Sequence, residues 1–318
     1  MFNAEDVRLH AFIESVGAYV PERVMTNREL STLVDTTDDW IVGHTGINER
    51  RLAAEDQKAS DLAVNAAKQA LERSGRSADA LDLILVATST PDFVGFPSTA
   101  CIVQEKIGAV HAGAMDLTAA CTGFIYGIDT ARAFIESGSA RHILVVGTEV
   151  FSRIVDWNDR GTCVLFGDGA GAALVSASDA GTSRIEPGIL RSDGSGAKYL
   201  YYDSFVHMNG RHVYNFAITA LCDTVEELLA GGGVGSDDVR YVVPHQANVR
   251  IIHAAARRLG LPDELFFTNM QRYANTSAAS IPIALNELVE RELLSRGDLL
   301  VTVGFGGGLT YGGNLIYW

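Results

Sequence analysis

Cysteine is scarce in this 318-residue chain, and the few cysteines present form no recognisable structural pattern. They include no CxxC pair and no cluster with histidine. The sequence therefore indicates neither a disulfide framework nor a zinc site. The four are Cys101, Cys121, Cys163 and Cys222. Such usage is typical of a reducing compartment, and we expect a cytoplasmic protein that binds no metal.

Long apolar runs and a targeting segment are also missing. Hydrophobic residues make up 47% of the chain, which is ample for a large core. No stretch, however, reaches the roughly 20 consecutive apolar residues that a membrane span requires. The first residues, Met1 to Asp6, lack the basic and then apolar order of a secretory signal. We therefore expect no membrane partner.

Positive charge is in deficit, because the formal net charge is −14. This balance argues against nucleic acid and anionic membranes as general partners. Against it, a local basic cluster is informative. Arg250, Arg257 and Arg258 lie close together on one helix-like segment. The cluster is either an ordinary solvated helix face or a docking site for an acidic partner.

Cys121 occupies the most informative position among the cysteines. It ends the apolar, strand-like run Asp116–Cys121, and apolar residues recur at helical spacing from Gly123 onward. A cysteine at the start of a helix faces unpaired N–H groups and the positive end of the helix dipole, which favours the nucleophilic thiolate. The sequence thus predicts covalent acyl chemistry, although a small buried core cysteine is the alternative.

The chain resembles itself at an offset of 157 residues. This offset superimposes the apolar strands 83–87 and 143–147 on 240–244 and 300–304. It also superimposes the helix-like segment 123–136 on 280–293. We infer two similar βαβαβ halves, 1–172 and 173–318, with helices covering mostly parallel sheets.

The duplication predicts where the functional residues meet. Cys121 corresponds to Ala278, which lies close to Asn275, and Thr88 corresponds to His245. We expect both His245 and Asn275 to follow a buried strand and to open a helix. Since ligands bind at the carboxyl ends of such strands, Cys121, His245 and Asn275 are predicted to converge across a pseudo-two-fold axis.

The chemistry of this trio suits acyl transfer. A neutral imidazole and a carboxamide both donate hydrogen bonds, and together they stabilise an enolate or oxyanion. A cysteine hydrolase is less consistent with the sequence, because His245 has no evident carboxylate partner. Helix capping is the structural alternative for His245 and Asn275.

Two glycine-rich segments need separate interpretation. Gly304–Gly313 follows an apolar strand but contains no GxGxxG, and a final strand follows it instead of a phosphate-binding helix. We expect a tight turn that brings a glycine N–H close to Cys121 as part of an oxyanion hole. Phe166–Gly171 is interpreted as a fold-forming turn.

Taken together, these residues resemble those of the 3-oxoacyl-[acyl-carrier-protein] synthase III family, within the thiolase superfamily. The resemblance covers almost the whole chain from Gly17. The motifs that carry it are Asp38–Ile41 with Thr45–Ile47, Ala119–Phe124, Asp159–Thr162, Phe166–Gly171, Pro244–Asn248, Asn275–Ala279 and Phe305–Gly308.

The resemblance implies an α/β protein with the duplicated αβαβα five-layer fold, two similar mixed sheets and a homodimeric assembly. It implies that Cys121, His245 and Asn275 form a catalytic triad. Cys121 would take the acyl group from a short acyl-CoA, and malonyl on acyl carrier protein would then lose CO2 and attack the acyl-cysteine. The N–H groups of Cys121 and Gly307 would form the oxyanion hole. Coenzyme A thioester would be a substrate, with no cofactor required.

The same matching assigns the surrounding residues. Coenzyme A would be bound by Trp40, Arg160 and Asn248, with Trp40 stacked on the adenine. The acyl pocket would be shaped by Phe166, Met208 and Phe305, with Phe96 reaching it across the dimer interface. Arg250, Arg257 and Arg258 would dock the acidic carrier protein.

The sequence departs from the family pattern in two places. His44 stands where many members have arginine, and the segment between Gly194 and His212 looks shorter than usual. The acyl preference and the choice between CoA and carrier protein as donor therefore stay open. A ketosynthase-III-like acyltransferase, or a condensing enzyme of secondary metabolism, is the alternative. A non-catalytic interaction protein is disfavoured because all three triad residues are present.

Overall fold

A computed structural model describes residues 9–179 and 182–318. The N-terminal stretch inspected for a targeting signal lies outside these residues. Within the described chain, no helix has the length and apolar character needed to cross a membrane.

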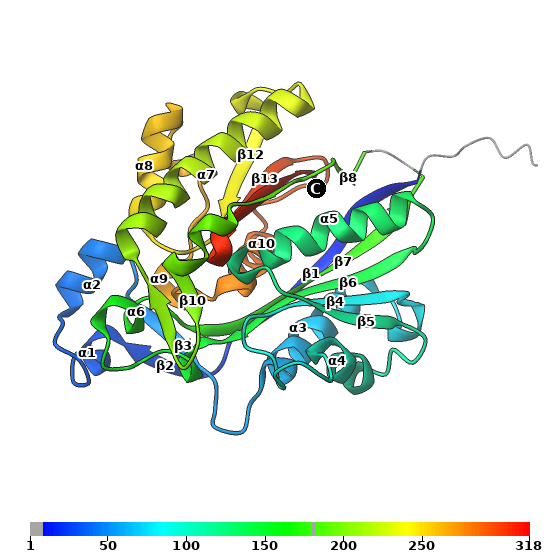
Figure 1. Cartoon of the computed structure of the whole chain (residues 1–318). Coiled ribbons are helices and arrows are strands. Elements are labelled where there is room, and N and C mark those ends of the chain that lie inside the picture. The colour runs from blue at the N-terminus through cyan, green and yellow to red at the C-terminus, as the bar shows by residue number, and fades with distance from the viewer. Residues whose placement is uncertain (1–8, 180–181) are drawn as a thin grey trace, which may run out of the picture.

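Two sheets form the framework of the molecule (Figure 1). The first has the spatial order β1 (His10–Tyr19), β7 (Asp168–Ser178), β6 (His142–Val150), β4 (Leu83–Ala87) and β5 (Gly113–Leu117). The second has the order β12 (Val239–Pro244), β13 (Leu299–Gly306), β14 (Thr310–Tyr317) and β8 (Arg184–Ile185), with β9 (Ile189–Ser192) also paired to β14.

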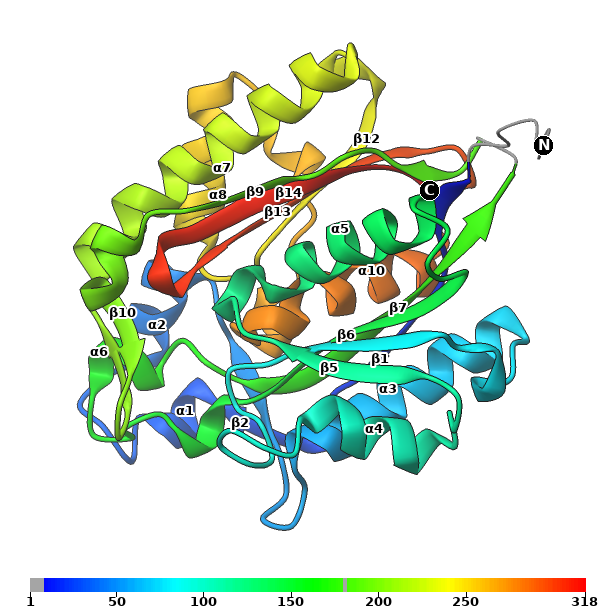
Figure 2. The same ribbon diagram turned by 45° about the vertical axis from the view of Figure 1, so that its right-hand side comes forward.

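Helices separate and cover the two sheets in five layers. Figure 2 shows α5 (Gly123–Glu136) and α10 (Ser280–Glu290) between the sheets. The outer face of the first sheet is covered by α3 (Ala59–Ser74) and α4 (Thr99–Ile107). The outer face of the second is covered by α7 (Gly210–Gly232) and α8 (Val249–Leu259). The layering predicted from the family resemblance is confirmed.

Coverage on both faces explains the unbroken apolar strands. Every residue of β13 is buried, as is every residue of β6 except His142 at its start. Three separate core clusters fill the spaces between the layers. A sheet covered on both sides needs no alternation of polar and apolar residues, so its strands read as continuous hydrophobic runs.

The sheets are mixed, and the strand pattern was wrong in predicting mostly parallel ones. Pairing is parallel for β4 with β5 and β6, and for β12 with β13. It is antiparallel for β7 with β1 and β6, and for β14 with β13, β8 and β9. The glycine-rich turn after β13 returns the chain directly into β14, and such a short connection permits only antiparallel pairing.

Smaller elements surround one end of the sheets. These are β2 (Arg23–Thr26), β3 (Glu49–Leu52), β10 (Leu200–Tyr202), β11 (Val206–Met208), α1 (Asn27–Leu30), α2 (Asp38–Thr45), α6 (Arg160–Cys163) and α9 (Met270–Tyr273). Strand β2 pairs with β3, and β10 with β11.

The offset of 157 residues recurs in the local backbone. The 3₁₀ turns Ala120–Thr122 and Ser277–Ala279 are separated by this offset, and their first residues both have left-handed φ, 46° and 48°. Each turn leads directly into one of the two central helices, α5 and α10. The two turns therefore face each other where the halves meet. The division into 1–172 and 173–318 remains a proposal, and its boundary falls inside β7.

The halves differ just before the second turn. The offset places β5 on residues 270–274, but this segment forms α9 and leaves only an isolated bridge between Phe166 and Asn275. The expectation that Asn275 follows a buried strand was therefore wrong. The sequence Met270–Tyr273 is mostly polar and has no β-branched residue, so little favours a buried strand there.

Glycines at equivalent positions allow the two turns to approach the strands. A Cβ on Gly147 of β6 would collide with the backbone carbonyl of Ala278. A Cβ on Gly304 of β13, 157 residues later, would lie 3.2 Å from the Cα of Thr122. Each half thus uses a strand glycine to admit the turn of the other half.

This packing predicts the effect of a single methyl group. Gly147→Ala is expected to destabilise the protein by about 1–3 kcal/mol, because the backbone of Ala278 cannot yield as a flexible side chain would. The matched control is Gly231→Ala in α7, where nothing lies within 4 Å of the added Cβ. Thermal unfolding of both variants measures the difference, and equal melting temperatures would contradict the account.

Candidate active site

Cys121 lies in the first of the two turns, between β5 and α5. Its side chain is only 6% exposed. The strained residue Ala120 precedes it, and the turn is tied to β14 by hydrogen bonds between the hydroxyls of Thr122 and Thr310, 2.9 Å apart. Strain of this kind persists where surrounding structure fixes it, and it is common at active sites.

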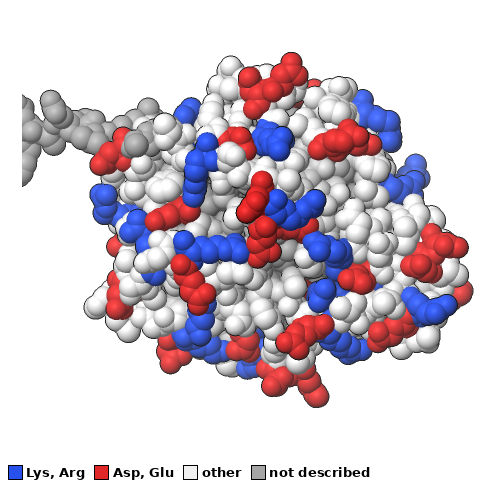
Figure 3. All heavy atoms as spheres, turned by 180° about the vertical axis from the view of Figure 1, so that it is seen from behind, with Lys and Arg blue, Asp and Glu red and all other residues white. Residues whose placement is uncertain are grey.

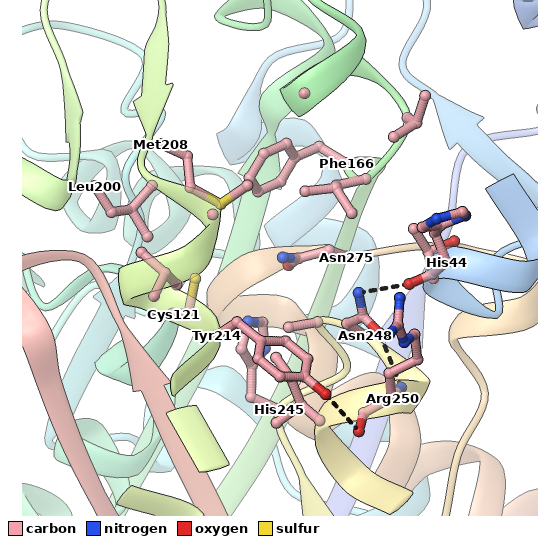
Figure 4. Close-up of a pocket in the computed structure, with 18 of the residues that line it drawn as sticks. His44, Cys121, Phe166, Leu200, Met208, Tyr214, His245, Asn248, Arg250 and Asn275 are labelled. Atoms are coloured by element: carbon pink, nitrogen blue, oxygen red, sulfur yellow. Dashed lines mark hydrogen bonds between the residues drawn. The ribbon is translucent and has the colours of Figure 1, made fainter. Parts of the chain in front are cut away.

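One cavity of about 270 Å³ brings the predicted trio together. Cys121, His245 and Asn275 all line it, although they come from both halves of the chain (Figure 4). Figure 4 shows the amide of Asn275 directed toward the side where Cys121 lies. The geometry agrees with the convergence that the duplication predicts.

His245 is held as a neutral hydrogen-bond donor. Its Nδ1 lies 2.7 Å from Oγ of Ser280, the first residue of α10, and that oxygen also accepts the N–H of Gln246 at 3.4 Å. This arrangement favours donation by the Ser280 hydroxyl to Nδ1, which leaves the ring proton on Nε2. Burial lowers the pKa of His245 to about 3, so the ring carries no charge near neutral pH.

Asn275 is oriented by the second turn. Its Oδ1 accepts the backbone N–H of Ser277 at 2.8 Å. The main chain of Asn275 is fixed as well, since its N–H donates to Leu165 and its carbonyl accepts from Gly167. With Oδ1 engaged, the Nδ2 group remains as the donor facing the cavity.

The thiol of Cys121 does not match the expectation of a favoured thiolate. Burial raises its pKa to about 12, while the Ser277 hydroxyl acts in the opposite direction with a smaller effect. The dipole at the start of α5 favours the thiolate, but removing the sulfur from water costs more than the dipole contributes. Since desolvation dominates, the site at rest holds a neutral thiol beside a neutral imidazole.

The glycine-rich segment lies against the cysteine. A Cβ on Gly306 would fall 2.8 Å from Cβ of Cys121. Gly307 begins the turn Gly307–Leu309, and it lines a second cavity of about 90 Å³ together with Cys121. Residues 314–317 belong to β14, so the predicted final strand is confirmed. This close approach is compatible with an N–H of the segment facing the sulfur.

The mouth of the larger cavity is formed by the residues assigned to coenzyme A. Trp40 stacks on His44 with ring centroids 4.3 Å apart, and the guanidinium of Arg160 lies 4.8 Å from the Trp40 ring. Asn248 caps α8 through its Oδ1 and donates from Nδ2 to the carbonyl of His44 at 3.0 Å. His44 therefore acts here as a packing partner of Trp40.

Three of the four acyl-pocket residues line the larger cavity, namely Phe166, Met208 and Phe305. Phe96 does not, because its side chain is 89% exposed on the segment between β4 and α4. Within the single chain it therefore lies outside the pocket.

The second cavity was predicted only in part. Cys121 and Phe166 border it, and so do Leu200, Tyr201, Tyr202 and Val206 of β10 and β11, which belong to the segment 194–212 that the sequence marks as unusual. Ser89, Phe151 and Ile154 also border this cavity, and no sequence motif indicated them. Phe151 directly follows β6 and stacks on Phe166 with centroids 4.6 Å apart.

The three arginines extend from the cavity to the surface. Arg250 lines the larger cavity, whereas Arg257 and Arg258 are exposed at the end of α8. Arg258 is partly balanced by Asp223, with an N–O distance of 3.5 Å. Figure 3, which views the molecule of Figure 1 from behind, shows basic and acidic side chains interspersed, with no broad region of one sign.

Comparison with known proteins gives consistent matches. Residues 115–194 match the family model described as 3-oxoacyl-[acyl-carrier-protein (ACP)] synthase III, and residues 229–318 match the model of its C-terminal part. A beta-ketoacyl-[acyl-carrier-protein] synthase III of Bacillus anthracis is 50% identical, covering 96% of this chain and 98% of that protein.

Solved structures extend the comparison. The 3-oxoacyl-[acyl-carrier-protein] synthase III of Aquifex aeolicus VF5 has a TM-score of 0.94 at 46% identity, covering 97% of this chain and all of the other. The priming beta-ketosynthase from the R1128 polyketide biosynthetic pathway has a TM-score of 0.91 at 35% identity, covering 97% and 96%.

The buried thiol leads to a prediction about alkylation. With a pKa of about 12, the thiolate fraction of Cys121 rises about tenfold per pH unit across the neutral and mildly alkaline range. Iodoacetamide labelling, followed by peptide mass spectrometry, should show this rise without a plateau. The exposed Cys101 should be labelled more completely at neutral pH. A plateau for Cys121 near neutral pH would show that the thiolate is stabilised after all.

Proposed function

The chain belongs to the 3-oxoacyl-[acyl-carrier-protein] synthase III family, whose members are acyltransferases that catalyse the initiating condensation of fatty-acid synthesis, and from this premise we propose how its residues act. The observation that carries the proposal is the convergence of Cys121, His245 and Asn275 in a single cavity. Two neutral donors beside a thiol suit condensation on a thioester.

In the first half-reaction, we propose that Cys121 attacks the carbonyl carbon of a short acyl-CoA. The N–H groups of Cys121 and Gly307 stabilise the oxyanion, and CoA leaves as the acyl-cysteine forms. Trp40, Arg160 and Asn248 hold the CoA at the cavity mouth. No metal or further cofactor is proposed to take part, since the thioester itself is the activated substrate.

In the second half-reaction, malonyl-acyl carrier protein enters the same cavity. Loss of CO2 leaves a carbanion whose enolate oxygen accepts hydrogen bonds from Nε2 of His245 and Nδ2 of Asn275. The carbanion attacks the acyl-cysteine to give 3-oxoacyl-acyl carrier protein. A neutral imidazole suits this role, because its proton is already on the nitrogen that faces the cavity.

The partners follow from the exposed surfaces. Arg250, Arg257 and Arg258 are proposed to dock the acidic carrier protein beside the cavity. The exposed apolar residues Val94 and Phe96 support a homodimer in which Phe96 reaches the acyl pocket of the second copy. We propose no nucleic-acid or membrane partner, and we propose that the enzyme works in the cytoplasm.

A second function shares the same site. The similarity to a priming ketosynthase of a polyketide pathway, together with His44 and the segment 194–212, supports a condensing enzyme or acyltransferase of secondary metabolism as the alternative. The acyl group accepted by the second cavity distinguishes the two.

The test separates the half-reactions. Incubation with a panel of acyl-CoAs, followed by intact-mass measurement, should give an acyl adduct that is lost in Cys121→Ala. Addition of malonyl-acyl carrier protein should then give a 3-oxoacyl product. In His245→Ala, condensation should fall by about 10²–10³-fold, since one preorganised donor is lost, while acylation stays largely intact.

Three other outcomes would contradict parts of this proposal. An adduct transferred unchanged to another acceptor would indicate acyl transfer without condensation. Loss of both steps in His245→Ala would contradict the division of labour. No adduct from any donor would contradict Cys121 as the nucleophile.

A further inference from the structure

Glu149 is a buried carboxyl group beneath the active site that the mechanism above does not use. It is the penultimate residue of β6 and its exposed fraction is 0%. Both of its oxygens accept the backbone N–H of Ser89, at 3.1 and 3.0 Å, and Oε2 accepts the Thr90 hydroxyl at 2.8 Å. Among the described residues, no lysine, arginine or histidine forms an ion pair with it. A buried carboxyl without a cation is costly, so its presence needs a reason.

Ser277 connects this carboxyl to the nucleophile. Its hydroxyl oxygen is buried and has no hydrogen-bond partner of good geometry in the resting structure. The turn that carries Ser277 packs directly against β6, because the carbonyl of Ala278 lies against Gly147, two residues before Glu149. From this place the Ser277 hydroxyl lowers the pKa of the Cys121 thiol and that of the Glu149 carboxyl. A buried hydroxyl without a partner requires an explanation.

We propose that Glu149 is a positioning residue that holds the proton released by Cys121 on acylation, and that the Ser277 hydroxyl carries this proton between them. The proposal rests on the proposed function, because it concerns the acyl-cysteine intermediate. It adds Glu149 of β6 and Ser277 of the second turn to the groups that act on Cys121.

The proton transfers balance over the two half-reactions. During acylation the Sγ–H bond breaks and the Sγ–carbon bond forms, while the thiol proton moves to Ser277 and the proton of Ser277 moves to the Glu149 carboxylate. CoA leaves as a thiolate and takes a proton from water. During condensation the new carbon–carbon bond forms and the Sγ–carbon bond breaks. The Cys121 thiolate then recovers its proton through Ser277, which restores the carboxylate.

The neighbouring groups favour Glu149 over His245 as the acceptor. Burial raises the pKa of Glu149 to about 7, whereas it lowers the pKa of His245 to about 3, so the carboxylate is the stronger base. The groups that face the carboxyl are the Cys121 thiol, the hydroxyls of Thr88, Thr90 and Ser277, and the N–H groups of Ser89 and Ala278. None of them is a cation.

The two half-reactions should therefore depend on pH in opposite directions. Acylation needs the ionised carboxylate, so its rate rises with pH and levels off above about 7. Condensation of a preformed acyl-enzyme needs the protonated carboxyl, so its rate falls as pH rises through the same range. Below the midpoint the acylation rate rises about tenfold per pH unit, and above the midpoint the condensation rate falls about tenfold per pH unit.

The experiment measures single-turnover CoA release, and separately product formation from isolated acyl-enzyme, across this pH range. Glu149→Gln should lose both pH dependences, and its acylation plateau should fall at least about tenfold. Ser277→Ala should lose the same pH dependences as Glu149→Gln, although its carboxyl is intact. Alanine can adopt the left-handed φ of position 277, because Ala120 has nearly the same φ. Glu149→Asp, which keeps a carboxyl, should restore part of the acylation limb.

Asp168→Asn is the matched control, because Asp168 is the other acidic residue with 0% exposure among the described residues, and it accepts hydrogen bonds from Ser152 and Ala53, neither of which is in the relay. It should retain both wild-type pH profiles. The proposal is overturned if Glu149→Gln or Ser277→Ala keeps both. If this happens while the wild type is still acylated and still condenses, the relay is wrong but the proposed function stands. If no acyl-CoA acylates the wild type, the relay and the proposed function are both overturned.

Discussion

The close contact between two short turns at the pseudo-two-fold axis is the constraint on which the site depends. One turn carries Cys121, and the other carries Ala278 at the equivalent position. Gly147 and Gly304 leave the space that each turn needs against the strand of the opposite half. A larger residue at either position would displace a turn, and with it the groups that the turn positions.

The second turn has no cysteine, yet the turn and Ser280 directly after it contact or orient all three members of the triad. The Ser277 N–H fixes the amide of Asn275, and the Ser277 hydroxyl lies near the Cys121 thiol. Ser280, directly after the turn, contacts Nδ1 of His245. Duplication has thus given one half the nucleophile and the other half its supports. Burial at this junction also keeps both the thiol and the imidazole neutral.

Much of the duplicated fold can be predicted from the sequence, because the offset of 157 residues relates apolar strands and helices. Their hydrophobic pattern is retained although few residues are identical. The same offset predicts that Cys121, His245 and Asn275 meet. Three features did not follow from it. The helix dipole gave the wrong direction for the Cys121 pKa, because desolvation depends on tertiary packing. Phe96 is exposed in the single chain, and its expected place in the acyl pocket of a second copy stays a prediction. Ser277 lies inside the motif Asn275–Ala279, yet its contacts depend on the tertiary fold, and no motif marks Ser280 or Glu149.

The central claim is that burial holds His245 as a neutral donor with its proton on Nε2. Nuclear magnetic resonance of ring-labelled histidine, assigned with His245→Ala, measures this state directly. The account predicts a neutral Nε2–H ring from about pH 5 to about pH 8, and a loss of this tautomer preference in Ser280→Ala. An imidazolium within that range, or a ring protonated on Nδ1 in the wild type, would contradict it.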